Sequence, residues 1–197
     1  QYISGIKATV QSKVYIPFHF VPAERYPQQG VYDYRVRPGG PLIQELLHQA
    51  TRMFVGPAGS DEAHLRRLIK LGIALHSFAD TWSHQRFSGR WNAADNDIER
   101  IALRQDDGAF ERLGLLDQIK HNLIPDIGHA EAVNFPDQSH LVWRYEHDYS
   151  GIEHTRVNSE LFLEAAEAIF NKLRALNPGS RIQWKAIAGA VHRCLTT

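Results

Sequence analysis

A histidine, an aspartate and a second histidine recur at four-residue intervals in the middle of the chain, at His76, Asp80 and His84. On a helix, side chains four residues apart lie on one side and drift by only about 40° per step. Their Cβ atoms are roughly 5–6 Å apart, so His76 and Asp80 can share one metal ion. The two histidines are about 12 Å apart along the helix, which is too far for one tetrahedral ion. The spacing therefore favours two ions with Asp80 between the histidines.

The sequence around these residues is typical of a long amphipathic helix. Ser60 followed by two acidic residues is a typical helix start, because the serine caps the first amide groups and the acids favour that end. Apolar residues at helical intervals then predict a helix that ends between residues 85 and 89. These residues are Leu65, Leu68, Ile69, Gly72, Leu75, Ala79 and Trp82. Gly72 would permit a close approach of another helix.

The composition limits the kind of metal site and the kind of partner. The 197 residues are enough for one domain with a substantial core. Since Cys194 is the only cysteine, a metal site must use nitrogen and oxygen ligands, and no disulfide can form within the chain. Lys plus Arg and Asp plus Glu both number 22, so no basic excess indicates nucleic-acid binding. The sequence contains no stretch of eighteen apolar residues, so it predicts no transmembrane helix.

The rest of the chain is predicted to consist of further helices joined by loops rich in proline and glycine. Besides residues 60–85, the predicted helices are 41–56, 97–105, 108–121, 156–177 and 181–194. Residues 1–41 and 123–140 are predicted loops. We therefore expect an all-α fold, with a single helical domain over residues 1–197. The chain begins at Gln1 without a methionine, so we expect a processed product or a piece of a longer chain, whose upstream segment could hold further site residues.

Two loop histidines are candidates to complete a metal cluster around the long helix. His19 lies between aromatic residues and two prolines, and His129 follows a glycine in the loop 123–140. Glu131 and Asp137 follow His129 and offer carboxylates. Each of these residues also has an ordinary interpretation, because loop histidines are commonly solvated and Asp137 follows a proline, as turn formers do.

Several other residues have both a functional and a structural interpretation. Arg156 and Asn158, at the start of a predicted helix, could bind an anion, but capping is the better explanation. Trp143 and Tyr145 could line a pocket, although core packing is favoured. His147, followed by an aspartate, is similar to the metal-binding pair of HD-type phosphohydrolases, but no matching upstream pattern accompanies it. Cys194 lies among apolar residues and is expected to be packed.

The sequence resembles a family of uncharacterised microbial proteins. The resemblance rests on the stretch HSFADTWSHQ at residues 76–85, followed by FSG at 87–89, GHAEA at 128–132 and Pro136-Asp137. That family looks like the bacterial zinc-dependent phospholipase C and the fungal and plant single-strand zinc nucleases. The resemblance implies an all-helical fold with a three-zinc site at the bottom of a cleft. It implies that His76 and Asp80 are metal ligands with Asp80 bridging, and that His84, His19 and His129 are further ligands.

This sequence departs from the pattern of those enzymes at two places. The enzymes have a carboxylate four residues after the loop histidine, where this chain has Val133, so Glu131 or Asp137 would have to substitute. They also have an upstream aspartate that acts as ligand and base, where this chain has Ser4 and Gly5. Both departures count against a third metal ion and against catalysis.

The sequence favours a metal-dependent hydrolase of phosphoester bonds, acting on a phospholipid headgroup or a small phosphodiester. Two zinc ions would polarise the phosphoryl oxygen and lower the pKa of bound water from about 15.7 towards 7. The expected ligands are His19, His76, Asp80, His84, His129 and Glu131, and the expected catalytic residues are Asp80 and Asp137. The alternative is a non-catalytic binding or toxin-like interaction module with a degenerate metal site, which the missing carboxylates at Ser4 and Val133 favour. A purely structural hydrogen-bond network of the histidines is a third interpretation.

Overall fold

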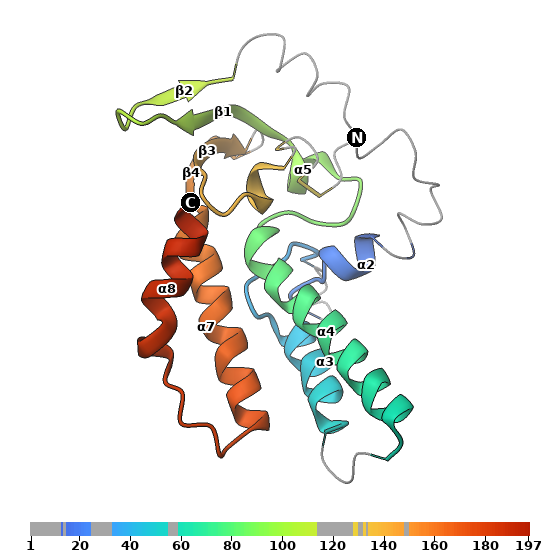
Figure 1. The fold of residues 1–197 in the computed structure, drawn as a ribbon. Coiled ribbons are helices and arrows are strands. Elements are labelled where there is room, and N and C mark those ends of the chain that lie inside the picture. The colour runs from blue at the N-terminus through green and yellow to red at the C-terminus, as the bar shows by residue number, and fades with distance from the viewer. Residues whose placement is uncertain are drawn as a thin grey trace.

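The computed structural model describes residues 13, 15–24, 33–54, 59–113, 128–129, 132, 134–147 and 150–197. In chain order the elements are α2 (Ile16–His19), α3 (Pro41–Arg52), α4 (Asp61–Ser83), α5 (Ala93–Asn96), β1 (Ile98–Arg104), β2 (Phe110–Arg112), the 3-10 helix η3 (Phe135–Asp137), β3 (Val142–His147), β4 (Ile152–Val157), α7 (Asn158–Leu176) and α8 (Trp184–Thr196). Helices α3 and α4 form one pair and α7 and α8 another, with the sheet at one end of both pairs (Figure 1). Helix α7 also packs against α4.

The expected all-α fold is wrong, because the described part of the chain includes a four-stranded antiparallel sheet in the order β2-β1-β3-β4. Strands β1 and β2 lie where helices 97–105 and 108–121 were predicted. The pairing of β1 with β3 shifts register between Glu99 and Ala102, and Arg100 has a positive φ of 52°. This bulge breaks the two-residue alternation and buries Ile98 and Ile101, three residues apart. That spacing imitates the apolar period of a helix.

Strand β3 shows the alternation that β1 lacks. Trp143, Tyr145 and His147 are buried, whereas the residues between them are half-buried. The interpretation of Trp143 and Tyr145 as core residues is confirmed, since both are fully buried. Strand β4 pairs with β3 from Val142↔Val157 onward and leads directly into α7, so Arg156 lies in a strand and not in the predicted helix.

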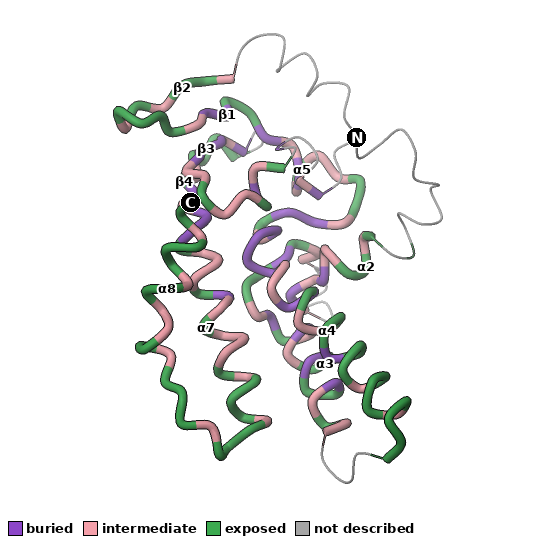
Figure 2. Tube along the Cα trace, in the orientation of Figure 1, coloured by how far each residue is buried: buried purple, intermediate pink, exposed green. Residues whose placement is uncertain are grey.

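The buried residues form two clusters. One cluster joins the helices and contains Val21, Ile43, Leu47, Leu71, Phe78, Trp82 and Ala165. The other lies against the sheet and contains Phe87, Ile98, Ile101, Ala132, Trp143 and Tyr145. In Figure 2 the buried positions gather along the sheet-proximal part of α4 and in the sheet, and the far ends of the helices are mostly exposed. The end of α4 is therefore the most buried part of that helix.

The predicted long helix is present as α4, and Ser60 caps it by accepting a hydrogen bond from the Ala63 amide at 3.3 Å. Part of its apolar face is not core, because Leu65, Leu68 and Ile69 are 46–56% exposed. A Cβ at Gly72 would meet nothing within 4 Å, so the close helix approach expected there does not occur. Cys194 is exposed and not packed. Among the described helices, none is long and apolar enough to span a membrane.

Candidate metal centre

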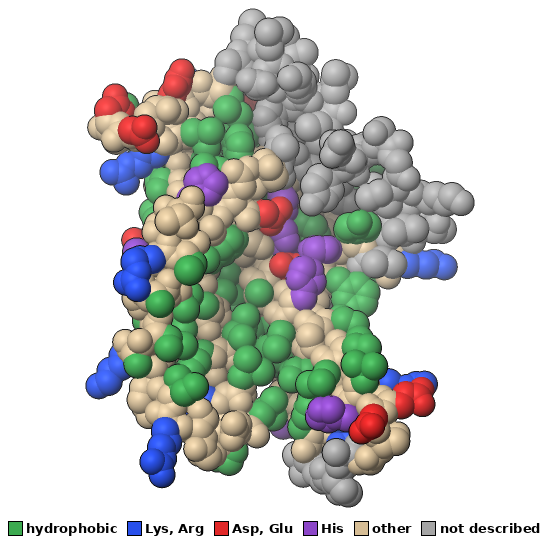
Figure 3. Space-filling view, in the orientation of Figure 1, with side chains coloured by type: hydrophobic (Ala, Val, Ile, Leu, Met, Phe, Trp, Pro, Cys, Tyr) green, Lys and Arg blue, Asp and Glu red, His purple; other side chains and the backbone are tan. Residues whose placement is uncertain are grey.

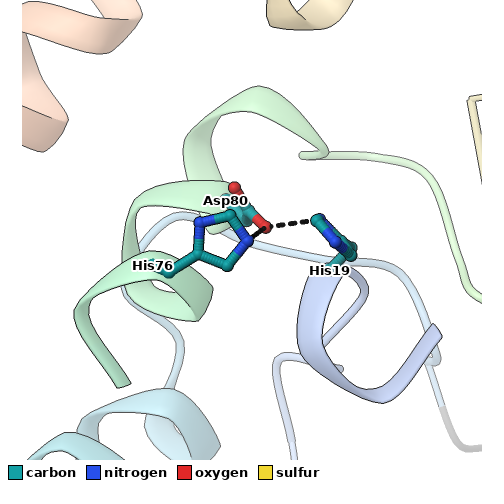
Figure 4. A group of neighbouring side chains, drawn as sticks. All are labelled: His19, His76 and Asp80. Atoms are coloured by element: carbon teal, nitrogen blue, oxygen red, sulfur yellow. Dashed lines mark ion pairs between the residues drawn. The ribbon is translucent and has the colours of Figure 1, made fainter. Parts of the chain in front are cut away.

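Helices α2 and α4 bring three imidazoles around one carboxylate oxygen. The distances to Asp80 Oδ2 are 2.8 Å from His19 Nδ1, 3.4 Å from His76 Nε2 and 3.8 Å from His84 Nε2. His76, Asp80 and His84 lie on successive turns at the end of α4, as the sequence spacing predicted. His19 comes from α2, and Figure 4 shows its ring and that of His76 directed at the Asp80 carboxylate. His19, His76 and Asp80 form the first group of possible ligands, with one donor atom of each within 4.8 Å of the others.

Two glycines create the space in which α2 lies against this site. A Cβ on Gly128 would lie 2.2 Å from Phe20 Cζ, and one on Gly89 would lie 2.5 Å from Ile16 Cγ2. Gly128 also has a positive φ of 60°, which L side chains rarely adopt. The glycines of the FSG and GHAEA stretches therefore position the segment that carries His19.

A second group of possible ligands consists of His84, His129 and Asp137. The rings of His84 and His129 stack with centroids 4.6 Å apart. The Asp137 carboxylate lies 3.7 Å from His129 Nε2 and 4.0 Å from His84 Nε2. One donor atom of each residue lies within 4.8 Å of the others. Since Asp80 Oδ2 is 3.8 Å from His84 Nε2, the two groups adjoin, with Asp80 between them.

The structure thus brings together every predicted site residue that it describes. Glu131 lies outside the described residues, as do Ser4 and Val133, at which the enzymes' carboxylates are absent. In Figure 3 histidine and acidic side chains gather on one face, over the sheet-proximal end of α4. His76 is 56% exposed, so the first group is open to solvent, whereas the His84 side chain is only 4% exposed.

Two buried polar atoms in the site lack partners. Asp80 Oδ2 and His84 Nδ1 are buried and have no hydrogen-bond partner among the described residues. The 2.8 Å contact between His19 and Asp80 is an ion-pair contact that lacks hydrogen-bond alignment. A buried donor or acceptor without a partner costs free energy, and native structures contain few of them. A cation held by the carboxylate oxygen and the surrounding ring nitrogens would remove the cost at Asp80, so the donor set fits a metal.

The site shifts the pKa values of its side chains in different directions. Close contact with the Asp80 carboxylate raises the pKa of His19, against the opposing effect of burial. Burial lowers the pKa of His84 well below its ordinary value of 6.5, and the imidazoles of His129 and His19 add to this effect. Burial also raises the pKa of Asp137, against the effect of His129. His84 is therefore neutral at physiological pH, the form in which histidine binds metals.

A family model matches the chain over residues 1–197. The chain belongs to the DUF6765 family, a family of unknown function. No curated protein matches it, and no solved structure does. The resemblance to zinc-dependent phospholipase C and the zinc nucleases stays a prediction, and the all-helical fold that it implied is not the fold of this DUF6765 chain.

Arg156 supports the second group from outside it, in a way that sequence reasoning missed. It is buried, and its Nη2 donates to the carbonyl oxygens of Ser83 at 2.7 Å and Trp82 at 3.2 Å. These are carbonyls at the end of α4, immediately before His84. Capping was the favoured interpretation, but Arg156 caps the end of α4 and not the helix that it precedes.

Asn158 supports Asp137 in the same manner. Its amide nitrogen donates to the carbonyl oxygens of Phe135 at 2.6 Å and Gln138 at 2.8 Å, on either side of Asp137. Its side-chain oxygen accepts a hydrogen bond from Trp143 Nε1 at 3.1 Å. These bonds fix η3 against the sheet. The sequence contains no local signal for either role, since both depend on contacts between distant segments.

Proposed function

We propose that this protein is a metal-dependent hydrolase of phosphoester bonds that holds two zinc ions, with Asp80 shared between them. The position of Asp80 Oδ2 carries the proposal. This buried oxygen has no hydrogen-bond partner among the described residues, yet three imidazole nitrogens from two adjoining groups lie within 3.8 Å of it. A carboxylate between two groups of possible ligands is the arrangement that two-metal hydrolases use.

The donor set supports zinc over other common ions. Four imidazoles and two carboxylates suit zinc, whereas magnesium and calcium prefer oxygen ligands. His19 and His76 would hold one ion and His84, His129 and Asp137 the other, with Asp80 shared. When bound, the ions would polarise a phosphoryl oxygen and lower the pKa of an attacking water.

Asp137 is the carboxylate best suited to move a proton. Its side chain is 41% exposed, whereas that of Asp80 is 14% exposed, so Asp137 is the one that reaches solvent. Its raised pKa brings it nearer to the range in which a carboxylate accepts a proton from water and later gives it up. Asp80 would hold and orient the ions. The zero formal charge favours a small phosphoester or lipid headgroup over long nucleic acids.

One observation favours a second candidate, a non-catalytic binding module with a structural metal. Helix α2 has only four residues and none of them is buried. A metal ion between His19 and Asp80 would fasten α2 to α4 without any catalysis.

Hydrolysis of synthetic phosphoesters by the zinc-loaded protein tests the proposal. The substrates are bis-p-nitrophenyl phosphate and p-nitrophenyl phosphorylcholine, compared between wild type, Asp80→Asn and His64→Gln. His64 is an exposed histidine of the same helix and serves as the matched control. We expect turnover by wild type and by His64→Gln, and none by Asp80→Asn. Zinc binding without turnover of either substrate class would favour the structural-metal alternative.

A further inference from the structure

A second cluster of nitrogen-bearing side chains lines a cavity of about 210 Å³ where the β3–β4 hairpin faces the segment after α4. Arg35, Arg86, His147 and His154 contribute to its wall, and no aspartate or glutamate of the described residues does. We propose that this cavity binds a small oxyanion of the phosphate class, at a site separate from the metal centre. Guanidinium groups recognise such ions through paired N–H donors and their permanent charge.

The cavity does not belong to the metal centre. The fully buried ring of Phe87 lies near both the metal centre and the cavity. Its centroid is 6.0 Å from that of His129 and 6.4 Å from that of His147. The Arg86 guanidinium would repel a cation, in contrast to the carboxylates of the metal centre, whereas the charge of Arg35 is balanced by Asp33. The two sites therefore have opposite ligand preferences, although both lie near Phe87.

Arg86 is held at the cavity in an unusual backbone conformation. Its φ is 76°, which residues other than glycine rarely adopt. Its amide donates to the Val36 carbonyl at 2.9 Å, and its Nη1 lies 3.4 Å from His154 Nε2. A conformation of this kind persists where the surroundings enforce it, commonly at functional sites. Here it directs a guanidinium towards the β3–β4 hairpin.

Of the other wall residues, His147 is the one that is free to bind an anion. Arg35 is already paired with Asp33, through Nε at 3.0 Å and Nη2 at 3.2 Å, so it contributes less than Arg86. His147 Nε2 is buried and has no hydrogen-bond partner among the described residues. A hydrogen phosphate ion both donates and accepts hydrogen bonds, so it can pair with a guanidinium and with a neutral imidazole.

The volume of the cavity favours a small ligand, and the charges around the adjoining cavity favour this cavity as the site of an anion. About 210 Å³ is below the roughly 300–1,000 Å³ typical of sites for organic ligands. An adjoining cavity of about 280 Å³ shares Arg86 and His154 and is also lined by Arg156, but Glu160 and Glu164 contribute two carboxylates to its wall. Those carboxylates would repel an anion, so we place it on the side of His147.

Calorimetric titration of inorganic phosphate into the metal-free protein, in EDTA and low salt, tests the site. Two variants remove the guanidinium, Arg86→Gln and Arg86→Gly, and the glycine suits the positive φ and so keeps the fold. The matched control is Arg100→Gln, because Arg100 also has a positive φ, of 52°, but pairs with Glu146 away from the cavity. We expect one phosphate per chain in wild type and in the control, and at least tenfold weaker binding in both Arg86 variants.

Imidazole resonances give a second readout on the wild-type protein. Phosphate should shift the ring signals of His147 and His154 and leave that of the exposed His64 unchanged. Absence of phosphate binding to wild type, or equal weakening in Arg86→Gln and Arg100→Gln, would overturn the site. Because EDTA removes metal ions, the result is independent of the proposed hydrolase activity.

Discussion

His19 Nδ1 lies 2.8 Å from Asp80 Oδ2, so a four-residue helix near the start of the chain meets the end of α4 at one carboxylate oxygen. The contact combines a raised histidine pKa with a buried oxygen that has no aligned hydrogen bond in the described residues. In the metal-free protein the pair is an ion pair while His19 is protonated. With a metal bound, both atoms become ligands, so metal binding has to release the proton of His19.

The pH dependence of stability follows from that pair. The pKa of His19 is raised, so the stabilisation it gives the metal-free protein is fully present below pH 6.5 and is lost as the pH rises through its raised value. Zinc-loaded protein should instead gain stability over the same window, because a deprotonated His19 binds the ion. Urea unfolding between pH 6 and 9, with EDTA or zinc, measures both slopes. The variant His19→Gln should reduce the difference between them, because the second group still binds zinc.

His84 should give the opposite slope at lower pH. Its pKa is lowered because the ring is buried, so the stability contributed by its neutral form is present above pH 6.5 and declines as the pH falls below that value. Comparison of metal-free wild type with His84→Asn between pH 4.5 and 7 measures this. A constant difference between the two proteins over that range would contradict the buried, neutral state of His84.

Glycine substitutions should separate packing at the site from general effects on helices. Gly128→Ala places a methyl group 2.2 Å from Phe20 Cζ at a positive φ. We therefore expect the variant to be about 1–3 kcal/mol less stable than wild type, and to lose the zinc ion bound by His19. Gly72→Ala, in the interior of α4 with nothing within 4 Å of its Cβ position, should stabilise by about 0.5–1 kcal/mol. Thermal unfolding and zinc content distinguish the two. Equal effects would show that Gly128 has no special role.

Arg156 should act as a positioning residue for the second group. Arg156→Met leaves the Trp82 and Ser83 carbonyls without their donor, so His84 should shift and the second zinc should bind at least tenfold more weakly. The control is Arg66→Met, because Arg66 is an exposed arginine of α4. Zinc titration by calorimetry resolves the two sites. Unchanged binding of the second zinc in Arg156→Met would contradict the role.

The two groups of ligands should lose zinc independently. His19→Gln removes a ligand of the first group and His129→Gln one of the second, so each variant should retain one zinc per chain. His64→Gln should retain two. Variants of both groups that retain two ions would show that these histidines do not bind metal.

The sequence was sufficient for the part of the site that lies on one helix. His76, Asp80 and His84 are related by helical period alone, so their common side followed from spacing. His19 and His129 became candidates from their surroundings and the resemblance, but their distances depend on close packing around Gly89 and Gly128. Strand β1 could not be predicted from the spacing of its apolar residues, because its bulge produces the apolar spacing of a helix.

Zinc content of the purified protein tests the central claim most directly. Elemental mass spectrometry of wild type and Asp80→Asn, each reloaded with zinc and dialysed, should give two ions per chain for wild type and fewer than one for the variant, because Asp80 is shared by both groups. Wild type that holds no zinc after reloading, or Asp80→Asn that still holds two ions, would contradict the two-metal centre.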